Sequence, residues 1–469
     1  MENFQLKRLN GEAFLQKAPS ALFAIALVAF PMLLLIYGWL GLPGNSVATG
    51  SLLAFLVIGL CGLGFRNRSA FHLSVLDVLF VVFFIPIMVT GFENRGFTEI
   101  KEVGLFVICG ILAYGAGRST VLEKLAAVPR YTLVVSATVV AMTCAATVPE
   151  LYRVWSVAEK RPIVFGFEHA ANLFAMALGP LVFGFVYSRT DWKSIQFWAV
   201  VILIYLATTL FVSSLVRYTF AVIIVSIGFM LVISISIKDQ AKTCRLALMM
   251  AAVVLGISSG VIVRYASVYS FTRAALQDSG ESSSVGREAE IEKKPELALA
   301  PSSMSLRKFD LPADETVVTQ QQLPPSCRAD VGLYNSVLIR RSLYQDSFYF
   351  VPRSGLFGVG LDNFKKLTCI KDHQVHNIYL QALIEAGWLG GAALLALTVC
   401  PLFFLARLIR SMDPSELSVF MFLIATFGFV ALLGLAHGTI SRALTFFMCA
   451  GAISGAISQR RQFGATKAL

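Results

Sequence analysis

The chain has 469 residues, of which 57% are hydrophobic and 14% charged, and its formal net charge is +11. Soluble domains are about 45–50% apolar and about 25% charged, so this composition excludes an ordinary soluble protein and predicts an all-α polytopic membrane protein. The basic residues lie mostly in short loops between apolar runs, so their charge reflects orientation in the bilayer and does not indicate a nucleic-acid partner.

Along the chain, about twelve apolar runs are long enough to cross a bilayer, which takes roughly 20 mostly apolar residues. They cover 20–41, 46–65, 71–91, 100–117, 131–149, 170–188, 194–213, 217–236, 244–263, 386–408, 416–436 and 440–458. The chain therefore divides into spans 1–9 over residues 1–263, a large loop over 264–376, and spans 10–12 with a tail over 377–469. No cleavage site follows the polar first residues, so we expect no cleaved leader.

The short loops on the two sides of the membrane differ in their content of Lys and Arg. With a cytoplasmic N-terminus, about 18 of these residues lie on the cytoplasmic side and about 7 on the other, as the positive-inside rule expects. Nine crossings then place the loop 264–376 outside the cytoplasm, which is the periplasm in a bacterium. Both termini are expected in the cytoplasm.

The large loop has two parts of different composition. Residues 277–326 are rich in Ser, Glu, Gln, Ala and Pro and poor in aromatics, so we expect them to be disordered or loosely packed. Residues 327–376 carry enough Tyr, Phe and Leu for a small folded unit. Their apolar spacing predicts a helix over about 333–350, which Pro352 ends.

Two cysteines and two histidines of this unit are candidates for a disulfide or for metal binding. Cys327 and Cys369 are the two cysteines outside the apolar runs, and in an oxidising compartment they either form a disulfide or stay as two free thiols. His373 and His376 are spaced to share a metal, but no acidic or cysteine ligand is matched to them. The sequence therefore predicts no metal and no other cofactor.

Polar residues where the loop meets the spans are the candidate functional site. His376 begins the tenth span, Arg217 stands at the outer start of the eighth, and Arg340 and Arg341 lie on the predicted loop helix. Arginine binds phosphate with two hydrogen bonds and keeps its charge, and histidine takes a proton near neutral pH. Together they suit transfer from a diphosphate-linked donor to a hydroxyl group.

Each of these residues also has a purely structural explanation. Arg217 alone is a typical interfacial anchor, Arg340 or Arg341 alone a solvated loop charge, and His376 alone a helix cap. Two further histidines, His169 and His437, fall on the same side, and nothing in the pattern singles them out.

A motif of about 50 residues resembles a known family. It reads Gly355-Leu-Phe-Gly-Val-Gly-Leu-Asp-Asn-Phe364, followed by His376-Asn-x-Tyr-Leu-x-x-Leu-x-Glu-x-Gly387-x-x-Gly390. This is similar to the signature of the O-antigen ligase and Wzy-type polymerase superfamily. These are bacterial inner-membrane glycosyltransferases of the GT-C type, with about twelve spans and one large periplasmic loop. The resemblance implies the same fold and localisation here.

The resemblance also implies an activity and residue roles. Such enzymes move a glycan from undecaprenyl diphosphate to lipid A core, or to a growing polysaccharide, on the periplasmic side and without a metal. His376 corresponds to the residue that activates the acceptor hydroxyl, and Arg217 and Arg340 to the arginines that bind diphosphate. Tyr344 follows the second arginine as in the family. Asn377 and Tyr379 stand in the motif as supporting residues.

Several functions remain open from the sequence. Within the class, an O-antigen ligase comes first and a polymerase of O-antigen, capsule or exopolysaccharide second, in either case with other polysaccharide-assembly proteins as partners. A secondary transporter or flippase would show Gly- or Pro-broken spans in matched halves, which the chain lacks. A structural or sensory protein would need no cluster of Arg and His at one place.

Overall fold

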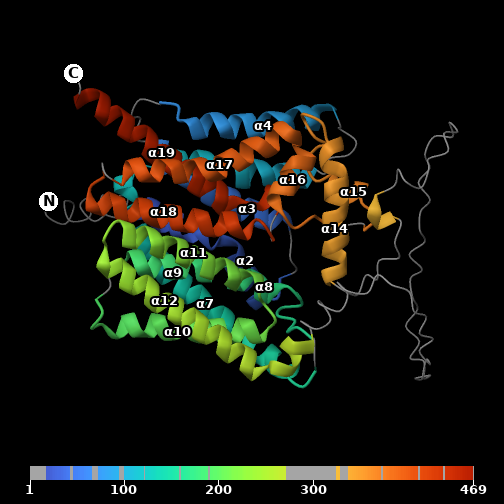
Figure 1. Ribbon diagram of the computed structural model, residues 1–469, viewed down its shortest axis with the longest axis vertical. Coiled ribbons are helices and arrows are strands. Elements are labelled where there is room, and N and C mark those ends of the chain that lie inside the picture. Colours follow the sequence, from blue (N-terminus) through green and yellow to red (C-terminus); the bar gives the residue numbers. More distant parts are fainter. Residues whose placement is uncertain are drawn as a thin grey trace, which may run out of the picture.

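The structure is a computed structural model that describes residues 17–42, 46–65, 72–93, 100–120, 122–157, 160–188, 191–270, 324–327, 336–370, 373–409, 412–436 and 439–467. Within these residues it contains helices, turns and one isolated bridge between Val164 and Phe167. Figure 1 shows the long helices side by side in one bundle. The protein is therefore an all-α multi-pass membrane protein, as the composition predicted.

In the described part of the chain, nine helical segments are long and apolar enough to cross a membrane, or ten with one bent pair. The nine are α4 (Val75–Glu93), α5 (Ile100–Phe106) with η1 (Val107–Leu112) and α6 (Ala113–Ser119), α7 (Val128–Arg153), α8 (Ala170–Ala175) with α9 (Leu178–Tyr187), α10 (Ile195–Ser213), α11 (Tyr218–Ser236), α12 (Gln240–Val263), α17 (Gly387–Leu408) and α18 (Pro414–Leu433). The bent pair joins Lys17–Leu27 to α2 (Ala29–Trp39) at 74°. Helices α3 (Ser46–Phe65) and α19 (Leu444–Lys467) lie at the two remaining predicted spans, and the count of about twelve stays a prediction.

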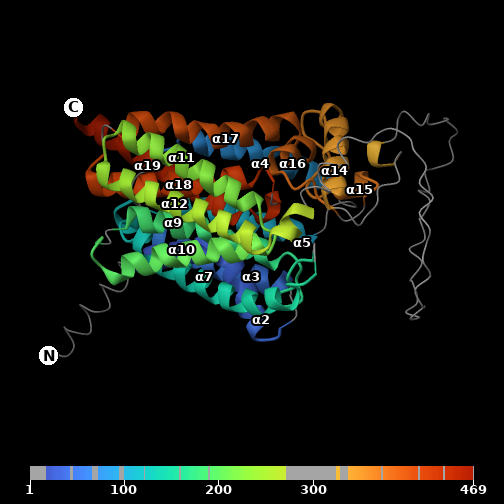
Figure 2. The same ribbon diagram turned by 60° about the horizontal axis from the view of Figure 1, so that its bottom comes forward.

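Helix α14 (Ser336–Phe350) lies across one end of this bundle, over the ends of the long helices (Figure 1). Figure 2 shows α14 at the same end, whereas the C-terminal end of α19 lies at the opposite end. We call the end that carries α14 the α14 end. The neighbouring short helices in the chain are η4 (Pro325–Cys327), η5 (Val351–Arg353), α15 (Phe364–Leu367) and α16 (Ile378–Glu385).

The second part of the large loop forms, with α16, a small fold on the α14 end. A helix was predicted over about 333–350, and α14 occupies Ser336–Phe350 before Pro352 in η5. Its apolar core is a cluster of five buried residues, namely Leu343, Phe364, Ile370, Val375 and Ile384. Cys327 and Cys369 are joined by a disulfide with their Cα atoms 5.2 Å apart. The segment expected to be disordered lies outside the described residues, except for Pro324, Pro325 and Ser326.

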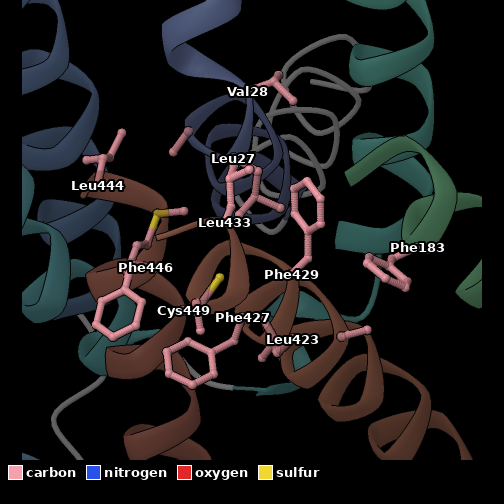
Figure 3. Packing of buried hydrophobic residues seen from close by; sticks show 14 of the residues in the cluster. Leu27, Val28, Phe183, Leu423, Phe427, Phe429, Leu433, Leu444, Phe446 and Cys449 are labelled. Atoms are coloured by element: carbon pink, nitrogen blue, oxygen red, sulfur yellow. The ribbon is translucent and has the colours of Figure 1, made fainter. Parts of the chain in front are cut away.

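The core of the bundle combines large aromatic side chains with close backbone contacts. In Figure 3, buried side chains of α18 and α19, including Phe427, Phe429 and Phe446, meet Phe183 of α9 and Leu27. Elsewhere small residues let helices approach closely. Lipid tails are as apolar as the side chains, so no hydrophobic effect drives helices together in the membrane, and close packing must supply the attraction. A Cβ at Gly117 of α6 would lie 2.0 Å from the Met448 carbonyl oxygen of α19.

The turn over 354–360 is hydrogen-bonded to the break between α16 and α17. Gly360 donates its N–H to the Glu385 carbonyl at 2.9 Å. Gly358 and Gly387 face each other with φ of 80° and 67°, a region that favours glycine. A Cβ on Gly358 would lie 2.4 Å from the Gly387 nitrogen, so the two chain segments touch through backbone alone.

The side chain of Glu385 reinforces the same junction. It is fully buried and accepts hydrogen bonds from the Phe364 N–H at 3.3 Å and from Gln381 Nε2 at 2.8 Å. Gln381 Oε1 in turn accepts from the Ile440 N–H at 3.1 Å, just before α19. Burial raises the pKa of Glu385 to about 8. The glutamate of the family-like motif is therefore a structural link here.

Substituting Gly358 by Ala should destabilise the protein, because the new Cβ would meet backbone atoms of Gly387 and Glu385 that cannot move aside. The left-handed conformation alone costs an L-residue about 1–2 kcal/mol, and the steric contact adds to it. Gly355→Ala is the matched control, since Gly355 has φ of 65° but a Cβ there meets nothing within 4 Å. We expect G358A to unfold at a lower temperature than G355A in detergent, and equal midpoints would contradict this.

Candidate functional site

His376 stands at the point where the chain enters α16. Its backbone has φ of 55°, a conformation that is uncommon for a residue with a side chain. The next residues hold it there: Asn377 Oδ1 caps α16 by accepting from the N–H groups of Tyr379 and Leu380 at 3.0 and 3.1 Å. The Ile378 N–H donates to the Gly434 carbonyl at 2.8 Å. Asn377 thus positions the histidine through the backbone.

Two tyrosines fasten α14 and α16 to the end of α18. Tyr379 Oη donates to the Ala431 carbonyl at 3.0 Å, and Tyr344 Oη donates to the Leu435 carbonyl at 3.1 Å. Both were expected to support the site. The structure gives each an anchoring contact with the bundle, so α14, which carries Arg340, and α16, which follows His376, share one support.

The surroundings of His376 keep its ring neutral near pH 7. The side chain is half-buried, and no hydrogen bond joins it to another described residue. Burial, with the nearby charges of Arg340, His373 and His169, lowers the pKa of His376 to about 4. A neutral imidazole with a free ring nitrogen can accept a proton from a ligand hydroxyl group.

Of the two adjacent arginines on α14, Arg340 is the one whose charge acts on His376. Its charge lowers the pKa values of His376 and His169, and it also interacts with Tyr218 at the start of α11. Arg341 is exposed, and no such effect on the histidines is seen from it. Adjacent residues on a helix point about 100° apart, so the two arginines lie in different surroundings.

Arg217 lies on the other side, directly before α11. The chain turns there through Leu215, whose φ is 64° although its side chain is large and buried. This strained turn ends α10 and directs Arg217 away from the bundle core, where its side chain is exposed. Partial desolvation and the charge of Arg161 lower the pKa of Arg217 to about 10.

Arg161 and His169 join the site, although the sequence did not single them out. Arg161 Nη1 lies 3.5 Å from His169 Nδ1. The pKa of Arg161 is lowered overall, mainly by burial. The charge of Glu168 opposes this shift, and the charge of Arg340 adds to it. One feature of the sequence could have indicated these residues. The connection between the predicted spans 131–149 and 170–188 has about 20 residues, which is too long for a simple turn, and it contains basic residues at its middle. His437 lies outside the described residues.

These residues form what we call the basic cluster: Arg161, His169, Arg217, Arg340, His373 and His376. They come from four separate parts of the chain and converge on the α14 end. Grouped positive charge at a half-buried site favours binding of an anion, since a bound anion relieves the mutual repulsion. Within the described ranges, no three His, Cys, Asp or Glu residues are placed to hold a metal ion.

Comparison with known proteins adds no assignment. No protein-family model matches the chain, and no curated protein matches it.

Replacing Arg340 by Gln should raise the pKa of His376 from about 4 toward 6.5, because a charge that opposes protonation is removed. We expect a rise of about one pH unit, since burial still acts. Diethylpyrocarbonate acylates neutral imidazole, so the pH at which His376 modification falls to half, followed by peptide mass spectrometry, reports this value. Arg341→Gln is the matched control and should leave the half-point unchanged. An identical half-point in R340Q and wild type would refute the assignment of Arg340.

Proposed function

We propose that the protein is a membrane glycosyltransferase that moves a glycan from undecaprenyl diphosphate to a hydroxyl acceptor on the periplasmic face of the bacterial inner membrane. The observation that carries the proposal is His376, a neutral proton acceptor with Arg340 beside it at one end of a membrane bundle. The resemblance of the motif around His376 to O-antigen ligases and Wzy-type polymerases supports the same activity. A transporter would need no base at this position.

The charge distribution supports a periplasmic site. Counted over the short loops, without residues 264–376, about 18 Lys and Arg residues fall on the side opposite α14 and about 7 on the α14 side, and the positive-inside rule assigns the richer side to the cytoplasm. The α14 end then faces the periplasm, where lipid-linked glycans are presented. Both termini lie in the cytoplasm in this orientation.

The reaction proceeds by direct displacement. The acceptor hydroxyl gives its proton to a ring nitrogen of His376 as its oxygen bonds to the anomeric carbon of the donor glycan. The bond from that carbon to the diphosphate oxygen breaks, and undecaprenyl diphosphate leaves with the electron pair. Arg217 and Arg340 stabilise the negative charge of the leaving group. The configuration inverts, and His376 later releases its proton to water.

The acceptor decides between ligase and polymerase. Ligase-type transfer to lipid A core is the form we favour, and polymerase-type transfer to another lipid-linked repeat uses the same groups. Surface and lipid-linked polysaccharide in a null strain would separate them. Loss of a ligase leaves the glycan unattached to core, whereas loss of a polymerase leaves single repeats on the core.

His376→Ala should lower transfer by about 10²–10⁴-fold, the usual contribution of a general base. The purified protein, supplied with lipid-linked glycan and an acceptor, gives the rate, and binding of the donor should persist because His376 does not hold the diphosphate. His373→Ala is the control on the same segment and should change the rate only several-fold, through the pKa of His376. Full activity in H376A would eliminate the proposed base.

Arg340→Gln should lower transfer by about 10²–10³-fold, because it removes a positive charge aimed at the leaving diphosphate. Arg341→Gln, one residue along α14 and exposed, should stay within about threefold of wild type. The same transfer assay compares the two variants. Equal losses would mean that α14 contributes only general positive charge to the site.

A further inference from the structure

Arg264, directly after α12, is a buried arginine bound to backbone carbonyls. It is 4% exposed. Its Nη1 donates to the Ser213 carbonyl at 3.0 Å, and its Nη2 lies 3.1, 3.0 and 2.8 Å from the carbonyl oxygens of Val154, Val157 and Lys160. No carboxylate of the described residues forms an ion pair with it. A buried charge without an opposite charge is costly, so the connection that it makes must matter to the fold.

The two segments that Arg264 joins both lead into the basic cluster. Ser213 is the last residue of α10, four residues before Arg217. Lys160 is followed at once by Arg161. A single guanidinium group therefore sets the distance between the backbone segments that carry these two arginines.

The loop that carries Arg161 is also fixed beyond this point. Val164 and Phe167 form a bridge, with the Phe167 N–H 3.0 Å from the Val164 carbonyl oxygen. The ring of Phe165 packs on Gly38 of α2 so closely that a Cβ there would lie 2.1 Å from it. Backbone contacts at Lys160 and from Val164 onward therefore hold the chain on both sides of Arg161.

The charge of Arg161 lowers the pKa of Arg217. Arg340 of α14 lowers the pKa of Arg161, whereas Glu168 raises it. The hydrogen bonds of Arg264 hold the two backbone segments together against the repulsion of these like charges. An anion between them turns this repulsion into binding energy, and arginine matches phosphoryl oxygens with two parallel hydrogen bonds.

We propose that Arg161 and Arg217 form a pair that binds a phosphoryl group of a diphosphate ester across from Arg340, with Arg264 as the positioning residue that sets their spacing. The pair deepens the proposed function and rests on it for the diphosphate ester. Binding of a phosphate anion by the pair does not depend on that function.

Binding of inorganic pyrophosphate to the full-length protein in detergent, measured by calorimetry at low salt, tests the pair. Arg161→Gln and Arg217→Gln should each weaken binding by about 10–100-fold, the usual cost of losing hydrogen bonds to a charged group. Lys160→Gln removes the same charge from the same loop one residue earlier and should change binding less than threefold. Binding unchanged in R161Q, equally weakened in K160Q, or absent from the wild-type protein would overturn the pair.

Arg264→Met tests the positioning role. It should weaken pyrophosphate binding and speed backbone hydrogen exchange over 154–161, while exchange in α14 stays as in the wild type. If Arg264 acts only by positioning Arg161, its loss costs nothing further once Arg161 is gone. The double variant R161Q/R264M should therefore bind pyrophosphate with about the affinity of whichever single variant binds it less tightly. The positioning role would be overturned if the losses of binding free energy in the two single variants added fully in the double variant, or if R264M bound pyrophosphate as the wild type does. If R264M does not fold, Arg264→Lys replaces it, since lysine keeps the charge but cannot span both segments, and the same outcomes apply.

The transfer assay separates this inference from the proposed function. Pyrophosphate binding that depends on Arg161, in a protein that transfers no glycan, would leave the pair standing and remove the glycosyltransferase. Glycan transfer that depends on His376 but proceeds at the wild-type rate in R161Q would keep the glycosyltransferase and remove the role of the arginine pair in it.

Discussion

The Ile378 N–H donates to the Gly434 carbonyl at 2.8 Å, and the hydroxyl groups of Tyr379 and Tyr344 donate to carbonyls of the same end of α18. These bonds use carbonyls at a helix terminus, where no intrahelical partner exists. They therefore stabilise α18 and at the same time fix α14 and α16 on the bundle. The position of His376 relative to Arg340 depends on them, since each belongs to an element anchored in this way.

Buried charge in this protein serves two purposes. Asp77 accepts from Tyr114, Arg118 and Ser454, and so links α4, α6 and α19 near the end opposite α14. Such a satisfied group holds helices together. The basic cluster differs, because it brings three arginines together and Glu168 is the acid whose charge acts on Arg161 and His169. A site built of like charges is arranged for a ligand of opposite charge.

Two positions near the proposed site have backbone conformations that restrict which residue fits. Gly355 has a φ of 65°, which proline cannot adopt. Leu215, two residues before Arg217, takes a left-handed turn that buries its side chain. Close to the first of these turns, Gly358 and Gly387 touch through backbone alone.

Much of this protein was determined by its sequence alone. Apolar runs of spanning length are a local property, so the membrane class and the helix positions could be predicted, as could a histidine at the start of α16. Tertiary structure decided which cations face that histidine. Arg340 and Arg341 are neighbours in the chain, and only the way α14 lies across the bundle chooses between them. Arg161, His169 and Arg264 act across gaps of about 50–215 residues, and packing alone closes such distances.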